Sequence, residues 1–468
     1  MKTRILSILA ICLAVLTVGG CDFGTHNSSV SEFSQAISIP PIESSVSASA
    51  PQSVATSSEV VPEDSSEPQS VAESSAVLSE PSSDPQSLPE SSNAVSEPVT
   101  VGEMRGVWIS FYDLADITDE DEYRSRIDRM FDLIEDSGLN AVFFHVRPFA
   151  DALYPSAIFP FSHIIGFKDS EGRIQGEDPG YDPLAYAVSA AHARGLQLHA
   201  WLNPYRVWTG SDDVTELAPN NIARIWLTDG NPDNDSNVIA YNNKLYFNPA
   251  SPEVRSLIVS GIAEIISNYA VDGIHFDDYF YPTTNAAFDA DSFAAYREAG
   301  GLLAQDDWRR ENVTKLISDV YQTVHAMSDL PFGVSPAGNM QRVMTEEYAD
   351  VALWGSGAGY VDYLCPQVYF GFRHETFPFV ETCADWRDLV TSSAVKLYIG
   401  LPAYKLGAAD SGAGSGKKEF QTDSEILASM VECTRDLNTD GFIIYSYEGL
   451  AGSANSAERE ALRTVLTD

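Results

Sequence analysis

Residues 272–282, DGIHFDDYFYP, form the stretch that decides the fold of this 468-residue chain. In an extended strand Ile274 and Phe276 would lie on one face, and His275 and Asp277 on the other. A strand that is covered on both faces should be apolar almost throughout, so the polar residues near its C-terminal end need an explanation. In parallel α/β folds functional sites lie beyond the C-terminal ends of the strands, so this pattern predicts a site there.

Seven further apolar runs surround this stretch and alternate with helical patterns. They are MRGVWIS from residue 104, NAVFFHVRP from 140, LQLHAWLNP from 196, PFGVSPAG from 331, VDYLCPQVYF from 361, VKLYIGLPAY from 395 and GFIIYSYEGL from 441. Helices are predicted over residues 120–137, 183–194, 252–269, 311–327, 346–354, 378–394, 424–437 and 457–466. Eight strands alternating with eight helices predict an α/β fold, a (β/α)8 TIM barrel over residues 100–468. An open, doubly wound sheet is the alternative fold.

Three long stretches, residues 151–182, 207–249 and 282–310, follow the second, third and fourth strands. In a barrel these would be βα loops at the C-terminal mouth, where binding sites are built. Polar side chains at period two near the ends of strands two, three, four and six would converge there. The expected substrate-binding residues are Arg147, Asp151, His199, Trp201, Asn203, Tyr205, Arg206, His275, Tyr279, Gln367, Tyr369 and Tyr404. A polar network satisfied inside the barrel is the alternative interpretation, above all for the histidines.

Aromatic residues at the strand ends suit the apolar faces of pyranose rings. A metal is not expected, because neither HxH nor HExxH spacing occurs among the eight histidines. Residues 229–235 have the alternating acidic spacing of a calcium loop, but Pro232 interrupts it and Ala240 stands at position twelve. We interpret this segment as an acidic surface loop, with calcium left open. No cofactor is expected.

The N-terminus has the pattern of an export signal. Lys2 and Arg4 precede an apolar run over residues 5–18 that is too short to span a bilayer. It leads through Val18-Gly-Gly to Cys21, a junction similar to the bacterial lipobox. We therefore expect a signal peptide over residues 1–20, lipidation of Cys21 and an extracytoplasmic protein held on the outer side of the cell membrane, or on the periplasmic side of an envelope membrane. A signal cleaved without lipidation is the alternative.

Residues 21–99 are dominated by Ser, Pro, Glu, Val and Ala and contain PQS repeats, a composition typical of a disordered linker. The formal net charge of −39 and the pI near 4.3 argue against nucleic acid as a partner. The membrane is expected to be contacted through the N-terminal lipid alone, and the protein is expected to be a monomer that binds a polysaccharide.

The motifs resemble those of the glycosyl-hydrolase-like 10 family of bacterial lipoproteins. The matching stretches are RGVWIS at Arg105, HVRPFADALYPS at His145, HAWLNPYRV at His199, NPASPEVR at Asn248, DGIHFDDYFYP at Asp272 and GVSPAGN at Gly333, continued by Trp354, VDY at Val361 and PQVY at Pro366. Two positions depart from the family pattern: His145 replaces a frequent Gln, and Ala337 varies. The resemblance implies a glycoside hydrolase. Because a characterised relative acts on peptidoglycan strands stripped of their stem peptides, it also implies cell-wall glycan as substrate.

Glycosidic cleavage requires one carboxylic acid and one carboxylate. Asp277, at the end of the fourth strand, is the first candidate, because its placement resembles that of the catalytic carboxylate in several barrel glycosidase families. Asp278, Glu448 and Asp151 are alternatives for the second carboxyl group. A binding protein that holds glycan without cutting it, as a scaffold or sensor, is the alternative function, and a hydrolase of another polysaccharide is a further one.

Overall fold

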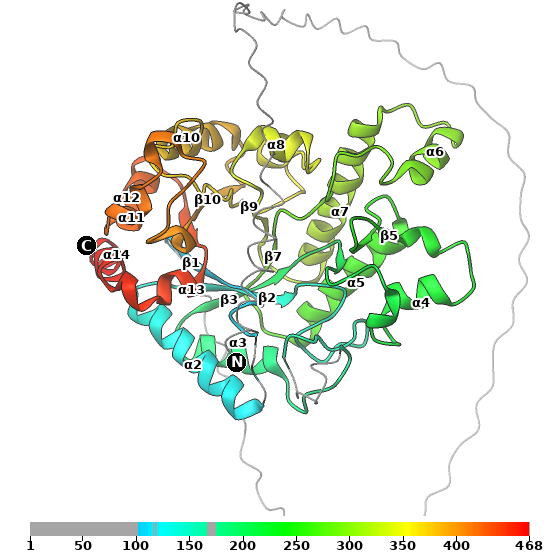
Figure 1. Cartoon of the computed structure of the whole chain (residues 1–468), viewed down its shortest axis with the longest axis horizontal. Helices are drawn as coiled ribbons and strands as arrows, with labels where there is room; N and C mark the ends of the chain where they lie inside the picture. Colours follow the sequence, from blue (N-terminus) through cyan, green and yellow to red (C-terminus); the bar gives the residue numbers. More distant parts are fainter. Residues whose placement is uncertain (1–101, 116, 118, 166–174, 468) are drawn as a thin grey trace, which may run out of the picture. The chain divides into compact units, whose positions relative to one another are not determined.

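A computed structural model describes residues 102–115, 117, 119–165 and 175–467 (Figure 1). The expected signal peptide, the lipidation site at Cys21 and the Ser/Pro/Glu-rich linker lie outside these residues. Among the described residues, no helix combines the length and the apolar character needed to cross a membrane.

Eight parallel strands close into a barrel at the centre of the described chain (Figure 1). They are β1 (Met104–Ile109), β2 (Ala141–Arg147), β3 (Gln197–Leu202), β7 (Gly273–Phe276), β8 (Phe332–Val334), β9 (Tyr363–Leu364), β10 (Lys396–Leu401) and β11 (Gly441–Ile444). Each strand pairs with its neighbours in chain order, and β1 pairs with both β2 and β11. This closure confirms the (β/α)8 barrel and rules out the open sheet.

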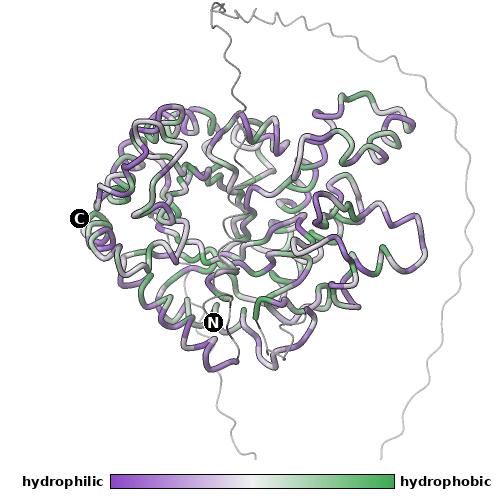
Figure 2. The backbone as a smooth tube through the Cα atoms, viewed as in Figure 1, coloured by the Kyte–Doolittle hydropathy of each residue, from purple (hydrophilic) through white to green (hydrophobic). Residues whose placement is uncertain are grey.

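Helices follow the strands and cover the outside of the barrel. The long ones are α2 (Glu120–Asp136), α3 (Pro183–His192), α5 (Pro252–Asn268), α7 (Gln305–Met327), α10 (Phe379–Leu389), α12 (Ile426–Asp436) and α14 (Ser456–Thr467). Local chemistry sets several of their starts: Asp182 and Ser251 each accept a backbone N–H of the first turn, and a proline follows each of them. In Figure 2 hydrophilic and hydrophobic residues alternate along these helices, as expected when one face packs on the barrel.

Of the long loops predicted after the second, third and fourth strands, the latter two contain elements of their own. The third carries a small antiparallel sheet of β4 (Arg206–Trp208), β5 (Val238–Ala240) and β6 (Leu245–Phe247), together with α4 (Ile222–Thr228). The fourth carries α6 (Ala290–Glu298). Two short helices that we did not predict, α11 (Glu419–Thr422) and α13 (Tyr447–Ala451), follow the last two strands.

The helix expected over residues 346–354 is interrupted. Instead, α8 (Met340–Thr345) ends before it, and α9 (Val351–Ser356) begins after Asp350, whose side chain accepts the N–H of Leu353. Between the two helices Tyr348 has φ 57°, a left-handed conformation that no helix accommodates. This break places Glu347 in a turn rather than on a helix.

The two faces of the barrel strands form separate apolar clusters. Val142, Leu198 and Ile274 belong to the large cluster between the barrel and its helices, whereas Phe143 and Trp108 belong to a smaller cluster inside the barrel. The predicted alternation of outward and inward residues is therefore confirmed. Inward positions near the C-terminal ends of the strands point toward the mouth.

Candidate active site

Asp277 follows β7 directly and is buried, with 3% of its surface exposed. Trp201 Nε1 donates to Asp277 Oδ2 at 3.1 Å, and Asn203 Nδ2 donates to Asp277 Oδ1 at 3.1 Å. The backbone N–H of Tyr279 donates to the same Oδ1 at 3.4 Å. The indole of Trp201 is itself held by stacking on His145, with ring centroids 3.8 Å apart. Strands three and four thus bring together side chains that the sequence predicted would meet.

The surroundings of Asp277 move its pKa into the neutral range. Burial raises the pKa of Asp277 to about 7, and the neighbouring Asp278 also raises it. The positive charge of Arg206 and the hydrogen bonds from Trp201 and Tyr279 act in the opposite direction. A carboxyl group with this pKa changes protonation near neutral pH, as acid–base catalysis requires.

Asp278 is half-buried beside Asp277, and burial raises its pKa as well. The side-chain amide of Gln367 donates a hydrogen bond to Asp278 and another to the backbone carbonyl of Ser335 at 3.0 Å. Gln367 lies just beyond β9, where single bridges link it to Ala337 and Gly400. The expectation that strand six contributes to the mouth is confirmed by this position.

Glu347 is a third acidic residue of this cluster, and the sequence analysis did not identify it. Burial raises the pKa of Glu347 well above its ordinary value, and the charges of Asp278 and Asp277 raise it further. Arg342 Nε lies 3.3 Å from Oε1, whereas Oε2 has no hydrogen-bond partner within the described part of the chain. The charge of Arg342 acts in the opposite direction, and the net effect on the pKa of Glu347 is upward. The sequence around Glu347 predicts a helix, so no spacing of polar residues indicated that Glu347 belongs to the site.

Glu448 was expected to end strand eight, but the structure places it elsewhere. Strand β11 stops at Ile444, and Glu448 lies exposed in the first turn of α13. Its backbone N–H donates to Asp113, which also accepts from the N–H and the hydroxyl of Ser110, each at 2.8 Å. Burial raises the pKa of Asp113 to about 6. Asp113, in the loop after β1, is thus a second acidic residue that sequence reasoning missed.

His275 and His199 are not at the mouth but inside the barrel, in one chain of hydrogen bonds. Trp108 Nε1 donates to His275 Nε2 at 3.1 Å, so His275 Nδ1 carries the proton and donates to Tyr363 Oη at 3.0 Å. Tyr363 Oη lies 3.4 Å from His199 Nδ1, and His199 Nε2 lies 3.4 Å from Gln197 Oε1. Burial lowers the pKa of His199 to about 4 and the pKa of His275 well below its ordinary value. For these two histidines the internal polar network replaces the predicted sugar contact.

Three more expected binding residues are buried against protein partners. The guanidinium of Arg147 donates to the backbone carbonyls of Phe149, Asn203 and Pro204. Asp151 accepts from Gln175 Nε2 at 3.0 Å and lies 3.2 Å from His163 Nδ1. Tyr205 is 1% exposed within the large apolar cluster. These side chains support the loops after strands two and three, and their predicted contact with a substrate stays a prediction.

The rim of the mouth carries the remaining expected residues. Arg206 lies over the ring of Tyr279 at 4.1 Å, and Tyr279 is 46% exposed. Tyr369 and Tyr404 pack together with Tyr445, whose ring is 5.7 Å from each of theirs. Tyr445 follows β11 and was not singled out from the sequence, although its position matches that of the other rim aromatics.

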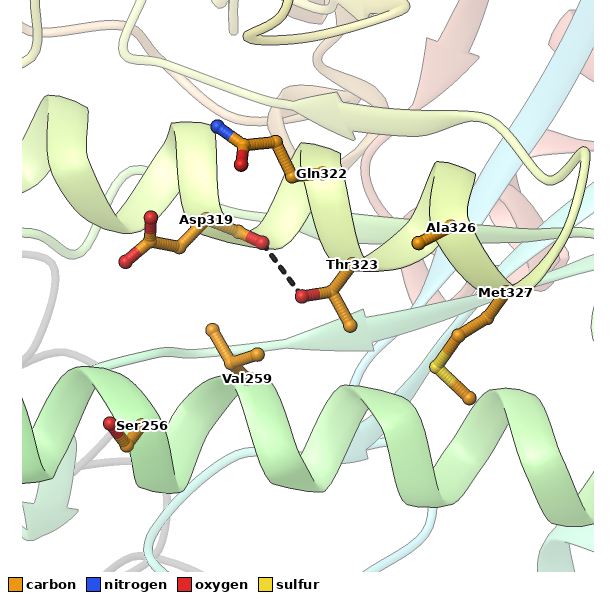
Figure 3. A pocket seen from close by; sticks show the side chains of 7 residues that line it. All are labelled: Ser256, Val259, Asp319, Gln322, Thr323, Ala326 and Met327. Atoms are coloured by element: carbon orange, nitrogen blue, oxygen red, sulfur yellow. Dashed lines mark hydrogen bonds between the residues drawn. The ribbon is translucent and has the colours of Figure 1, made fainter. Parts of the chain in front are cut away.

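Within the described residues no group of three or more His, Cys, Asp or Glu side chains could hold a metal ion. In the acidic loop, Asp229 accepts hydrogen bonds from the N–H of Asn231 and the side chain of Asn234. A groove on the outer wall lies between α5 and α7, and Figure 3 shows Ser256, Val259, Thr323 and Met327 among the residues that line it. Its carboxylate, Asp319, is paired with Arg255 at 2.7 Å, so the groove offers no comparable chemistry.

A TIM barrel with buried carboxyl groups and aromatic rings at its C-terminal mouth defines the architecture of a glycoside hydrolase. A model of the glycosyl hydrolase-like 10 family matches residues 103–413. The chain belongs to this family, which confirms the resemblance seen in its motifs.

Individual relatives agree with this assignment. Glycosyl hydrolase YngK of Bacillus subtilis is 35% identical over 330 residues, which cover 65% of this chain and 61% of YngK. Glycosyl hydrolase DigH of Escherichia coli K12 is 33% identical over 333 residues, covering 65% of this chain and 74% of DigH. The glycoside hydrolase domain of PgaB (BpsB) from Bordetella bronchiseptica shares the fold, with a TM-score of 0.50 at 15% identity over 78% of this chain and 99% of that domain.

Proposed function

We propose that this protein is a surface-anchored glycoside hydrolase that cleaves glycosidic bonds in cell-wall glycan, with peptidoglycan strands stripped of their stem peptides as the substrate. The observation that carries the proposal is the cluster of buried carboxyl groups formed by Asp277, Asp278 and Glu347. Burial raises the pKa of each member, neighbouring carboxylates raise the pKa of Asp277 and Glu347 further, and the hydrogen bonds around the three groups differ. Environments of this kind separate an acid from a base.

Asp277 is assigned the role of carboxylate. It accepts hydrogen bonds from Trp201, Asn203 and the backbone of Tyr279, and these donors stabilise an ionised oxygen pair. In the reaction Asp277 either attacks the anomeric carbon or takes a proton from the water that does so. Asn203 also accepts the backbone N–H of Arg206 at 3.0 Å, which fixes its amide toward Asp277.

Glu347 is assigned the role of general acid. Burial and the charge of Asp278 raise its pKa, which favours the protonated form, and its Oε2 is not engaged by any described residue. Transfer of its proton to the glycosidic oxygen lets the leaving sugar depart as a neutral alcohol. Arg342, 3.3 Å from Glu347 Oε1, then stabilises the carboxylate that remains.

The anchoring part of the proposal rests on the sequence of residues 1–99. A diacylated Cys21 and a Ser/Pro/Glu-rich spacer would hold the barrel outside the cytoplasm within reach of the wall. Radiolabelled palmitate should be incorporated into the full-length chain and not into Cys21→Ser. Equal labelling of both chains would contradict lipidation at this site.

The catalytic part is tested with the soluble domain, residues 100–468, and amidase-treated glycan strands. Mass spectrometry of the soluble products should show hydrated, non-anhydro oligosaccharides, and these should be absent with Asp277→Asn. Glu448→Gln is the matched control, because this exposed carboxylate lies outside the buried cluster. If these strands and a panel of other polysaccharides all give no product while the domain still binds strands, the protein is a glycan-binding scaffold or sensor. If only another polysaccharide gives products, the protein is a hydrolase of that polysaccharide and the proposed wall-glycan substrate is wrong.

A further inference from the structure

Arg206 holds its guanidinium group in a fixed position near the candidate catalytic residues. Its backbone N–H is bound to Asn203, the same residue that donates to Asp277. Its guanidinium carbon lies 4.1 Å from the centre of the Tyr279 ring and 5.7 Å from that of Phe149. Stacking on an aromatic face orients the guanidinium plane and leaves the N–H groups at its edge available. The guanidinium forms no ion pair with a carboxylate of the described residues, although its charge lowers the pKa of both Asp277 and Asp278.

Lys244 is a second cation, at the end of the small sheet. Arg206 pairs with Tyr246 across β4 and β6, with a register shift between Arg206 and Trp208, and Lys244 comes directly before β6 at the end of the same sheet. A two-residue turn fixes Lys244: Asn242 and Asn243 have φ 49° and 57°, and Tyr241 and Lys244 exchange both backbone hydrogen bonds, at 2.9 and 3.1 Å. Burial and the charge of Arg206 lower the pKa of Lys244, so the two cations repel each other.

Two neighbouring cations that form no ion pair with a described carboxylate need an explanation in a chain with 67 acidic and 28 basic residues. Their mutual repulsion disfavours the empty arrangement, and an anion between them relieves it. We propose that Arg206 and Lys244 form a subsite for a carboxylate carried by the glycan, next to the candidate catalytic Asp277. The planar fork of an arginine fits a carboxylate bidentately, and a lysine adds a point charge.

This subsite deepens the proposed function and rests on it for the identity of the glycan. In peptidoglycan the stem peptide is attached through an amide to a lactyl ether carboxylate, so removal of the peptide frees that carboxylate. A site that requires the free anion therefore explains a preference for stripped strands without any contact to the missing peptide. A uronic acid offers the same chemistry in other polysaccharides.

Binding is measured so that the result does not depend on cleavage. In an Asp277→Asn background, the dissociation constant is determined for stripped strands with free carboxylates and for the same strands whose carboxylates have been coupled to methylamine. The free acid should bind about tenfold or more tightly, the value of a charge-assisted hydrogen bond. Arg206→Gln and Lys244→Gln should each reduce this ratio, and the double variant should bring it close to one. Lys315→Gln, a cation exposed on α7 and paired with Glu311, should leave the ratio unchanged.

Equal affinity for acid and methylamide strands would overturn the subsite, as would a preference that survives in the double variant. If Arg206→Gln does not fold, the half-buried Lys244 carries the test alone. A polysaccharide that alternates N-acetylhexosamine with uronate distinguishes the source of the anion: tight binding that both substitutions weaken would support the subsite and assign it to uronates. Hydrolysis is scored separately with wild-type protein, so a binding preference without products would refute the proposed hydrolase and retain the subsite.

Discussion

Replacing His275 by glutamine should change how stability depends on pH. Burial lowers the pKa of His275 well below its ordinary value of 6.5, so the folded protein keeps this residue neutral while the unfolded chain binds a proton below pH 6.5. The stability of the wild type is therefore reduced as pH falls through 6.5. One such histidine costs about 1.4 kcal/mol per pH unit once its unfolded form is fully protonated, which gives about 2 kcal/mol between pH 7 and pH 5. Glutamine keeps a donor and an acceptor but does not titrate.

The measurement is the free energy of unfolding in urea at pH 7 and pH 5 for both proteins. Comparing the two cancels the contributions of buried carboxyl groups, whose raised pKa values act in the opposite direction. Tyr363→Phe is the matched control. It removes the hydroxyl that lies 3.0 Å from His275 Nδ1 and should destabilise the protein by about 1–3 kcal/mol at both pH values. If the free energy of unfolding changes by the same amount between pH 7 and pH 5 in the wild type and in His275→Gln, His275 is not held neutral. The hydrogen bonds assigned to it inside the barrel would then be wrong.

Three further changes test the site. Arg206→Gln removes a positive charge that lowers the pKa of Asp277, so that pKa should rise. Because activity requires the carboxylate and is lost as pH falls through its pKa, the acid limb of the kcat/KM profile should move to higher pH. An unmoved limb would contradict the assignment of Asp277. Glu347→Gln should reduce kcat by roughly 10²–10⁴-fold on glycan strands and much less on a dinitrophenyl glycoside, whose leaving group needs no proton. Arg309→Met should destabilise the fold by about 3–5 kcal/mol in urea unfolding, because Asp289 would remain buried without its partner, and adding Asp289→Asn should restore part of this loss.

The sequence predicted the parts of the site that belong to barrel strands. Period-two alternation shows which side of a strand a residue occupies, and the closed barrel then brings the ends of β3 and β7 together. The meeting of Trp201, Asn203 and Asp277 follows from these two facts. Alternation does not show depth along the barrel axis. His275 and Asp277 share an inward side, yet one lies inside the barrel and the other at its mouth, so the sequence assigned both to the substrate.

Glu347 was out of reach of this reasoning because no strand carries it. Its position depends on Tyr348, whose left-handed backbone lies between α8 and α9 and whose hydroxyl accepts from Arg309 Nη1 at 3.0 Å. Arg309 in turn is bound to Asp289 at 2.9 Å and to the backbone carbonyl of Asn285 at 2.9 Å. The second carboxyl group is thus placed by contacts between the loops after strands four and five. None of these contacts produces a repeating pattern of apolar and polar residues that could be recognised in the sequence.

The two candidate catalytic groups are consequently supported in different ways. Asp277 is held by donors on a neighbouring strand, so its geometry depends on the barrel itself. Glu347 is held through a buried ion pair between Arg309 and Asp289, which are 1% and 0% exposed at their side chains. A buried pair of this kind contributes little net stability relative to apolar packing but becomes costly when one partner is lost. The presence of the Arg309–Asp289 pair is therefore better explained by its effect on the geometry of the turn at Tyr348 than by a contribution to stability. Substitutions of Arg309 should consequently impair proton donation by Glu347 while the hydrogen bonds around Asp277 persist.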